Sequence, residues 1–197
     1  KGQEEKRPSR LWRYMSPALR SLLISDVLIR FAEQIPYAFV VVWCIKYNGI
    51  TATRFGLLTA IEMITAVLVY IPVAWLADRS TKKPFVVITF INFTLFPLII
   101  LFAHSFWMMV VVFIIRGLKE FGEPTRKALI MDLAPEGKKA GMFGLYYLIR
   151  DVIVSVAAFG GAFLWEISPQ VNFLMAFACG VAGTIYFWIF GRDLKSN

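Results

Sequence analysis

The sequence is poor in the residues that most often carry catalysis, metal binding and covalent cross-links. Its 197 residues include one histidine, His104, and two cysteines, Cys44 and Cys179. His104 lies between two apolar runs with no second ligand nearby, so we expect no metal site. Both cysteines lie within apolar runs, which predicts buried free thiols. Gly-x-Ser-x-Gly and His-Glu-x-x-His motifs are also absent, so neither an enzyme nor a cofactor is expected.

Charged residues are scarce as well. They form 17% of the chain, against about 25% in an ordinary soluble domain, whereas hydrophobic residues form 58% and aromatic residues 16%. This composition excludes a disordered chain and argues against a water-soluble globule. A net charge of +8 could suggest nucleic acid, but membrane proteins carry a cytoplasmic excess of Lys and Arg. We therefore predict an integral membrane protein in a lipid bilayer, with no nucleic-acid partner.

Six apolar segments are long enough to cross a bilayer as helices, which takes about 20 residues each. They lie at about 21–46, 54–77, 84–103, 106–130, 140–163 and 169–190. The short linkers between them predict antiparallel neighbours. The fold class expected is therefore an all-α integral membrane domain of six transmembrane helices over residues 21–192. A basic linker at residues 1–20 precedes it, and a tail at residues 193–197 follows.

Lysine and arginine are concentrated at alternate linkers. The amino segment, the linker after the second span, the region after the fourth span and the tail carry most of them. The positive-inside rule places these parts in the cytoplasm, together with both termini. Residues 1–20 lack the apolar stretch of a signal peptide, and a start at Lys is compatible with a fragment or a processed product. The predicted location is multi-pass in a bacterial inner (plasma) membrane.

Ionisable residues inside the predicted spans are the main functional signal. They are Asp26, Arg30, Glu33, Glu62, Arg116, Lys119, Glu120, Glu123, Arg150 and Asp151. Each costs about 2.5–3.5 kcal/mol at the bilayer centre, so they should face protein or water rather than lipid. The first three are spaced i, i+4, i+7, and Arg116, Glu120 and Glu123 repeat this spacing on the fourth span. Each triplet therefore lies on one helical face.

Two interpretations of these charges remain open. They either form ion pairs that stabilise the bundle, or they line a path for a polar solute or a proton. The predicted path residues are Asp26, Arg30, Glu33, Glu62, Arg116, Lys119, Glu120 and Glu123. Glu62 either neutralises Arg30 or Arg116, or carries a proton itself. Glu33, Glu120 and Glu62 are the candidates for a coupling proton.

The two charged helices also resemble each other locally. Residues 30–36 and 116–124 share an arginine, a glutamate and a closing proline in the same order. This predicts a three-plus-three inverted repeat, which recurs in secondary transporters with binding sites at broken helices near the midplane. Pro36 and Pro124 are the predicted positions of the breaks.

Residues 74–83 read AWLADRSTKK. This resembles the loop signature of the major facilitator superfamily, Gly-x-Leu-Ala-Asp-Arg-x-Gly-Arg-Lys, with Ala74 and Thr81 where the family usually has glycine. Residues 123–146 are similar to the family's linker between the fourth and fifth helices of one half. The segment 160–173 is similar to its last two helices. The resemblance covers residues 21–192.

The resemblance implies that the chain is the carboxyl-terminal six-helix half of a twelve-helix transporter. Its partner would be an amino-terminal half, as a separate chain, a missing part of the same chain or a second copy. Together they would move a small-molecule solute by alternating access, through a cavity lined by the first and fourth helices. The alternative is a degenerate half that only anchors or regulates a partner in the membrane.

The family's loop acid joins a charge network that holds one conformation closed. By resemblance, this assigns Asp78 to a cytoplasmic gate. The predicted members of the gate are Asp78, Arg79, Lys82, Lys83, Arg126, Asp132, Arg150 and Asp151. For Lys82 and Lys83, the main role expected is orientation by the positive-inside rule, whereas orientation does not require the acid Asp78.

Overall fold

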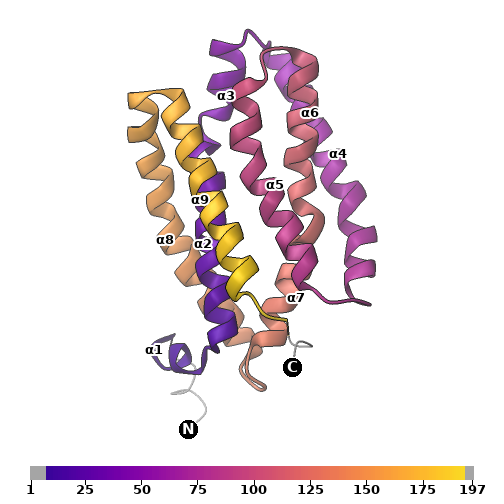
Figure 1. Cartoon of the computed structure of the whole chain (residues 1–197), viewed down its shortest axis with the longest axis vertical. Helices are drawn as coiled ribbons and strands as arrows, with labels where there is room; N and C mark the ends of the chain where they lie inside the picture. The colour runs from indigo at the N-terminus through magenta and orange to yellow at the C-terminus, as the bar shows by residue number, and fades with distance from the viewer. Residues whose placement is uncertain (1–7, 194–197) are drawn as a thin grey trace.

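The computed structural model describes residues 8–193, and every element within that range is a helix. The elements are α1 (Pro8–Leu11), η2 (Trp12–Tyr14), α2 (Pro17–Tyr37), α3 (Val40–Val42), η3 (Trp43–Tyr47), α4 (Ala52–Ala77), α5 (Lys83–Phe102), α6 (Phe106–Gly117), η4 (Leu118–Gly122), α7 (Glu123–Leu133), α8 (Lys139–Ile167) and α9 (Pro169–Phe190). Helix α1 and the end of α9 lie at the same end of the bundle (Figure 1). Four basic residues of the amino segment and the tail lie outside the described residues: Lys1, Lys6, Arg7 and Lys195. Most of the predicted tail also lies outside them.

Short polar side chains start most of the long helices. The residues just before α2, α4, α6 and α9 are Ser16, Thr51, Ser105 and Ser168. Each hydroxyl accepts a hydrogen bond from the backbone N–H three residues later in the chain. Such caps satisfy N–H groups that have no partner within the helix. Helix α5 is capped from a distance, because the Asp193 carboxylate accepts hydrogen bonds from two backbone N–H groups at the start of that helix.

Two of the six predicted spans are interrupted. The first forms α2 and then, after a break, the short α3 and the π-helical η3, with a bend of 43° between the two parts. Pro36 lies in the last turn of α2, two residues before this break, and has no N–H to donate to the preceding turn. The fourth forms α6, the 3-10 helix η4 and α7. Here the break precedes Pro124, which occupies the first turn of α7, where proline is well tolerated.

Four helices, α4, α5, α8 and α9, are long and apolar enough to cross a membrane, and the bent pair of α2 with α3–η3 makes up to a fifth. Helix α8 ends at Ile167 rather than near residue 163, and α2 begins at Pro17 rather than near residue 21. The segment from α6 to α7 differs because η4 interrupts it and charged residues gather around the interruption. Residues 8–193 are therefore all-helical in their regular structure, with four to five candidate spans.

Helix α2 lies at the centre of the packing. It contacts α9 and α8 most extensively, and α5 packs against α9, α6 and η4, whereas α4 lies at one edge against α6 and η4 (Figure 1). Glycines allow the closest approaches. A Cβ at Gly183 would stand 2.9 Å from the Ser25 carbonyl oxygen, and one at Gly180 would stand 2.6 Å from the Thr94 hydroxyl. Two small residues on α9 thus bring α2 and α5 against the same helix.

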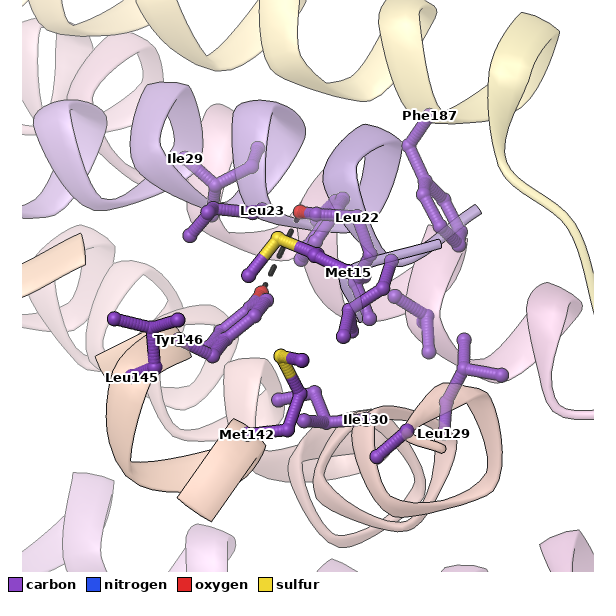
Figure 2. Close-up of a cluster of buried hydrophobic side chains, with 14 of the residues drawn as sticks. Met15, Leu22, Leu23, Ile29, Leu129, Ile130, Met142, Leu145, Tyr146 and Phe187 are labelled. Carbon is purple, nitrogen blue, oxygen red and sulfur yellow. Dashed lines mark hydrogen bonds between the residues drawn. The ribbon is translucent and has the colours of Figure 1, made fainter. Parts of the chain in front are cut away.

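Apolar side chains are buried in clusters along the bundle. One cluster includes Leu22, Ile29, Met142 and Phe187, and it surrounds the inward-pointing Tyr146 of α8 (Figure 2). Other apolar side chains remain exposed in long rows on α4 and α8. The most exposed in these rows are Met63, Val67, Leu68 and Ile71 on α4, and Val156, Phe159 and Ile167 on α8. Exposed apolar surface of this extent is typical of a protein surrounded by lipid or by another membrane domain.

Candidate functional site

The buried charges of the bundle form one continuous chain of ion pairs. Its members come from α2, α4, α6, η4, α7 and α8, so it joins most of the long helices. A buried charge is costly unless it is paired and hydrogen-bonded. The chain of pairs divides into two clusters that differ in their contact distances.

The tight cluster consists of Asp26, Glu123, Arg126 and Tyr146. Asp26 is fully buried, and its Oδ2 accepts hydrogen bonds from Arg126 Nη1 at 2.7 Å and from the Tyr146 hydroxyl at 2.6 Å. Arg126 also binds Glu123 through two nitrogens, at 2.9 and 3.2 Å. Charge-assisted, bidentate contacts of this kind are the strong ones in proteins. The cluster therefore joins α2, α7 and α8 through hydrogen-bonded charges.

Gly122 explains how α7 presents these side chains to α2. It is the last residue of η4, and its N–H donates to the buried Thr89 hydroxyl of α5. A Cβ at this position would collide with the Phe85 carbonyl oxygen, so glycine allows the backbone to approach α5 directly. The start of α7 is thereby fixed, and Glu123 and Arg126, three residues apart, share the face toward α2.

Arg30 links the two clusters. Its Nη2 lies 2.9 Å from Glu123 Oε2, and its Nη1 lies 3.1 Å from Glu33 Oε2. Its Nε lies 3.5 Å from the remaining Asp26 oxygen. The guanidinium also stands 5.0 Å from the centre of the Phe93 ring, within range of a cation–π interaction. One arginine of α2 thus contacts acids on both sides.

The loose cluster consists of Glu33, Glu62, Arg116 and Lys119. Lys119 Nζ lies 4.0 Å from Glu33 and 3.8 Å from Glu62, and Arg116 Nε lies 3.5 Å from Glu62. None of these three contacts is a hydrogen bond, because the usual distance for N–H···O is about 2.7–3.2 Å. The four side chains keep between 12% and 16% of their surface exposed. Glu120 makes no ion pair with any described residue.

The structure thus brings seven of the eight predicted path residues into one chain of ion pairs, and Glu120 stands beside it. It pairs Glu62 with Arg116 and Lys119, and Arg30 instead contacts the acids of α2 and α7.

The predicted gate residues do not form a single network. Lys82 Nζ lies 2.8 Å from Asp132, which connects the start of α5 with α7. Lys83 Nζ donates to the Trp188 carbonyl oxygen at 2.9 Å and so connects α5 with α9. These contacts lie at the end of the bundle that also holds α1 (Figure 1).

The remaining gate candidates take part in neither of these two contacts. Asp78 ends α4 in an exposed position, with no ion pair to any residue in the described range. Arg79 lies over the ring of Trp75 at 3.9 Å. Arg150 pairs with the exposed Asp151 at 2.9 Å and stands 3.7 Å from the Asp26 carboxylate. Arg126 and Arg150 were expected to be partners of Asp78, but the packing of α7 and α8 against α2 directs both toward Asp26.

Two groups of functional side chains went unnoticed in the sequence. Tyr146 is one helical turn before Arg150, and Tyr147 accepts a hydrogen bond from Arg126 at 3.0 Å. Asn172 is fully buried and donates to the carbonyl oxygens of Ile35 and Gly161, at 3.1 and 2.8 Å. A buried asparagine in an apolar span is a signal in itself, whereas aromatic residues in such spans are too common to be one.

In the described part of the chain, no three His, Cys, Asp or Glu side chains gather in a way that could hold a metal ion. His104 Nδ1 lies 3.1 Å from the Asn48 side-chain oxygen, where two loops meet. Cys44 is buried and Cys179 is partly buried, and both are free thiols.

Comparison of the sequence with known proteins identifies the family of the chain. The sequence profile of the Major Facilitator Superfamily matches residues 22–196. The chain is 22% identical over 165 residues to an uncharacterized MFS-type transporter, YqjV, of Bacillus subtilis, covering 83% of this chain and 40% of that protein. It is 26% identical over 154 residues to the quinolone resistance protein NorA of Staphylococcus aureus, covering 78% of this chain and 40% of that protein.

The chain therefore spans less than half the length of these relatives. The profile, in contrast, covers nearly the whole chain. The chain belongs to the Major Facilitator Superfamily of multi-pass integral membrane transporters, which are not enzymes.

Proposed function

We propose that this chain is one six-helix half, the carboxyl-terminal one, of a secondary active transporter that moves a small solute by alternating access. The six crossings are α2 with α3–η3, α4, α5, α6 with η4 and α7, α8, and α9. The basic linkers between α4 and α5 and between α7 and α8 face the cytoplasm under the positive-inside rule. The observation that carries this proposal is the chain of ion pairs inside the bundle, most of whose members lie on the two interrupted helices.

The other half of the transporter is the proposed partner. The chain covers 40% of its curated relatives, which leaves room for a further domain of similar size in proteins of their length. The exposed apolar rows of α4 and α8 supply surfaces for such a domain or for lipid. The charges pair between the helices of the bundle, and secondary transporters have their binding sites at interrupted helices near the midplane.

Glu120 is the proposed carrier of a coupling proton. Each of the other four predicted path acids faces at least one cation within 4 Å; these acids are Asp26, Glu33, Glu62 and Glu123. A fixed cation favours the ionised carboxylate. Glu120, partly buried and without such a cation, has the weakest reason to stay ionised. Glu33 and Glu62 remain secondary candidates, since their cations stand at longer range.

Uptake into proteoliposomes that contain the complete transporter tests this proposal. The solute panel includes a quinolone, because the name of one relative refers to quinolone resistance. We expect transport of at least one solute to require an imposed pH gradient, and Glu120→Gln to remove that requirement. The control is Glu136→Gln, which changes an acid in an exposed linker and should leave transport intact.

Two results would contradict the proposal. Unchanged transport in the Gln variants of Glu120, Glu33 and Glu62 would exclude proton coupling through these acids. A complete protein that no solute stabilises in a thermal-shift screen, and that carries none, would favour the alternative of a membrane anchor or regulatory module.

A further inference from the structure

A small, partly open cavity of about 10 Å³ lies beside the loose cluster. Polar side chains line it from four helical elements: Glu33 from α2, Asn92 from α5, Arg116 from α6 and Lys119 from η4. The rings of Phe93 and Phe96 form its apolar walls. A cavity of this size has room for about one water molecule, and a buried water needs about two to four polar partners.

The two cations at this cavity have unused hydrogen-bond donors. Neither Arg116 nor Lys119 donates a hydrogen bond to any described residue, although each has a carboxylate within 4.0 Å. Polar groups that stand more than about 3.5 Å apart can be bridged by a water molecule. The distance of 4.0 Å between Lys119 Nζ and Glu33, which both line the cavity, allows such a bridge, whereas Glu62 does not line it.

Asn92 supplies an acceptor at the same place. Its side-chain nitrogen donates to the Ile88 carbonyl oxygen at 3.0 Å, one turn back on its own helix. This contact fixes the orientation of the amide and leaves the side-chain oxygen without a donor among the described residues. Glu33 has further acceptor capacity, because a carboxylate accepts about four hydrogen bonds and this one accepts two, from Arg30 and Gln34.

We propose that this cavity is a hydration site that holds one water molecule between Glu33, Asn92, Arg116 and Lys119. The water accepts hydrogen bonds from the two cations and donates to the Glu33 carboxylate and to the Asn92 side-chain oxygen. All four hydrogen-bonding positions of the water are then filled. The water bridges Lys119 and Glu33, which make no direct hydrogen bond, and gives Arg116 an acceptor.

A consequence for transport follows, and this part rests on the proposed function. Charges that already contact water can separate without leaving a dry, unpaired group behind. The loose cluster is therefore the place where α4 and η4 can move apart from α2 during the transport cycle. The tight cluster, whose contacts are direct and short, offers no such place.

Hydroxyl-radical footprinting of the complete transporter in lipid nanodiscs tests the hydration site. Radicals formed from bound water oxidise nearby side chains even when these are buried, and the modified residues are then identified by mass spectrometry. Phe93 and Phe96 are 4% and 6% exposed, whereas Phe90 and Phe113 are fully buried and do not line the cavity. We expect Phe93 and Phe96 to be oxidised several-fold faster than the other two.

Variants of Asn92 identify the source of the labelling. Asn92→Leu removes the acceptor, so labelling of Phe93 and Phe96 should fall toward the rate of Phe90. The matched variant Asn92→Asp keeps an acceptor of the same size, and the fast labelling should persist. If Asn92→Leu does not fold, Ala32→Ser replaces it, because a hydroxyl at this cavity-lining position takes the place of the water.

Equal labelling of all four phenylalanines in the unmodified protein would overturn the proposal. So would fast labelling that Asn92→Leu leaves unchanged. Neither measurement needs a transported solute, so a failure of the hydration site and a failure of the proposed transport function are seen separately.

Discussion

The two clusters of the charge network use the same residue types at different distances. In the tight cluster, Asp26 and Arg126 are 0% and 1% exposed and lie 2.7 Å apart. In the loose cluster, Glu62 and Arg116 are 16% and 12% exposed and lie 3.5 Å apart. In both clusters, acids on one helix face cations on a different helix: α2 faces α7 in the tight cluster, and α4 faces α6 in the loose cluster. They differ in whether the charges meet directly.

This difference separates a structural joint from a movable contact. Removing one partner from a buried, hydrogen-bonded ion pair leaves an uncompensated charge in a dry place, which is strongly destabilising. A partly hydrated pair loses little, because water replaces the missing partner. We therefore infer that the tight cluster holds α2, α7 and α8 together, whereas the loose cluster allows α4 and η4 to move.

The largest effect is expected for Arg126→Leu. This change removes the main partner of both Asp26 and Glu123, which remain buried, so stability should fall by about 3–5 kcal/mol. Denaturant unfolding of the complete transporter in detergent micelles measures the loss. Arg116→Leu is the matched variant in the loose cluster, and there we expect about 1 kcal/mol or less. Equal losses would mean that the two clusters do not differ in kind.

Tyr146→Phe should have the second-largest effect. The change removes the hydroxyl that donates to Asp26 at 2.6 Å and keeps the ring that packs among the side chains in Figure 2. Hydrogen bonds to charged groups contribute about 1.5–3 kcal/mol, so a loss of that size is expected in the same unfolding measurement. Tyr147→Phe is the control, since Arg126 keeps three other hydrogen bonds to acids. A greater loss for Tyr147→Phe would contradict this order.

Gly122→Ala tests whether the backbone, rather than the charges alone, positions the tight cluster. The added methyl would contact the Phe85 carbonyl oxygen and the Thr89 hydroxyl, so α7 must shift away from α5. Overpacking of this kind costs about 1–3 kcal/mol. Gly144→Ala on α8 is the control, because a Cβ there meets nothing within 4 Å. If both variants unfold alike, the close approach at Gly122 does not matter to the cluster.

The sequence located the charges but could not choose their partners. The spacing of Asp26, Arg30 and Glu33 placed them on one face, and the structure finds all three in the network. Arg126 was assigned to a gate at the end of the bundle. Its true partner depends on the start of α7 against α5, a tertiary contact that no local pattern contains. Helical periodicity describes one helix, whereas an ion pair depends on two.

The interrupted helices show the same limit. Pro36 and Pro124 indicated approximately where regular helix is interrupted: the first break, at residues 38–39, follows Pro36, and the second, η4, precedes Pro124. The size of the bend and the 3-10 form of η4 could not be predicted, because packing determines them. Asn172, which donates to the carbonyl oxygen of Ile35 beside the first break, comes from a helix more than 130 residues away in the chain.

The smallest effect is expected for Glu62→Gln. The amide keeps the size of the carboxylate, and the two cations near it, at 3.5 and 3.8 Å, are not hydrogen-bonded to it. Stability should therefore change by about 1 kcal/mol or less. A double-mutant cycle with Arg116→Leu should give a coupling energy within about 0.5 kcal/mol of zero, as for residues that act independently. A coupling comparable with that between Asp26 and Arg126 would show that Glu62 and Arg116 meet directly. The loose cluster would then be a second joint, and α4 could not move without breaking it.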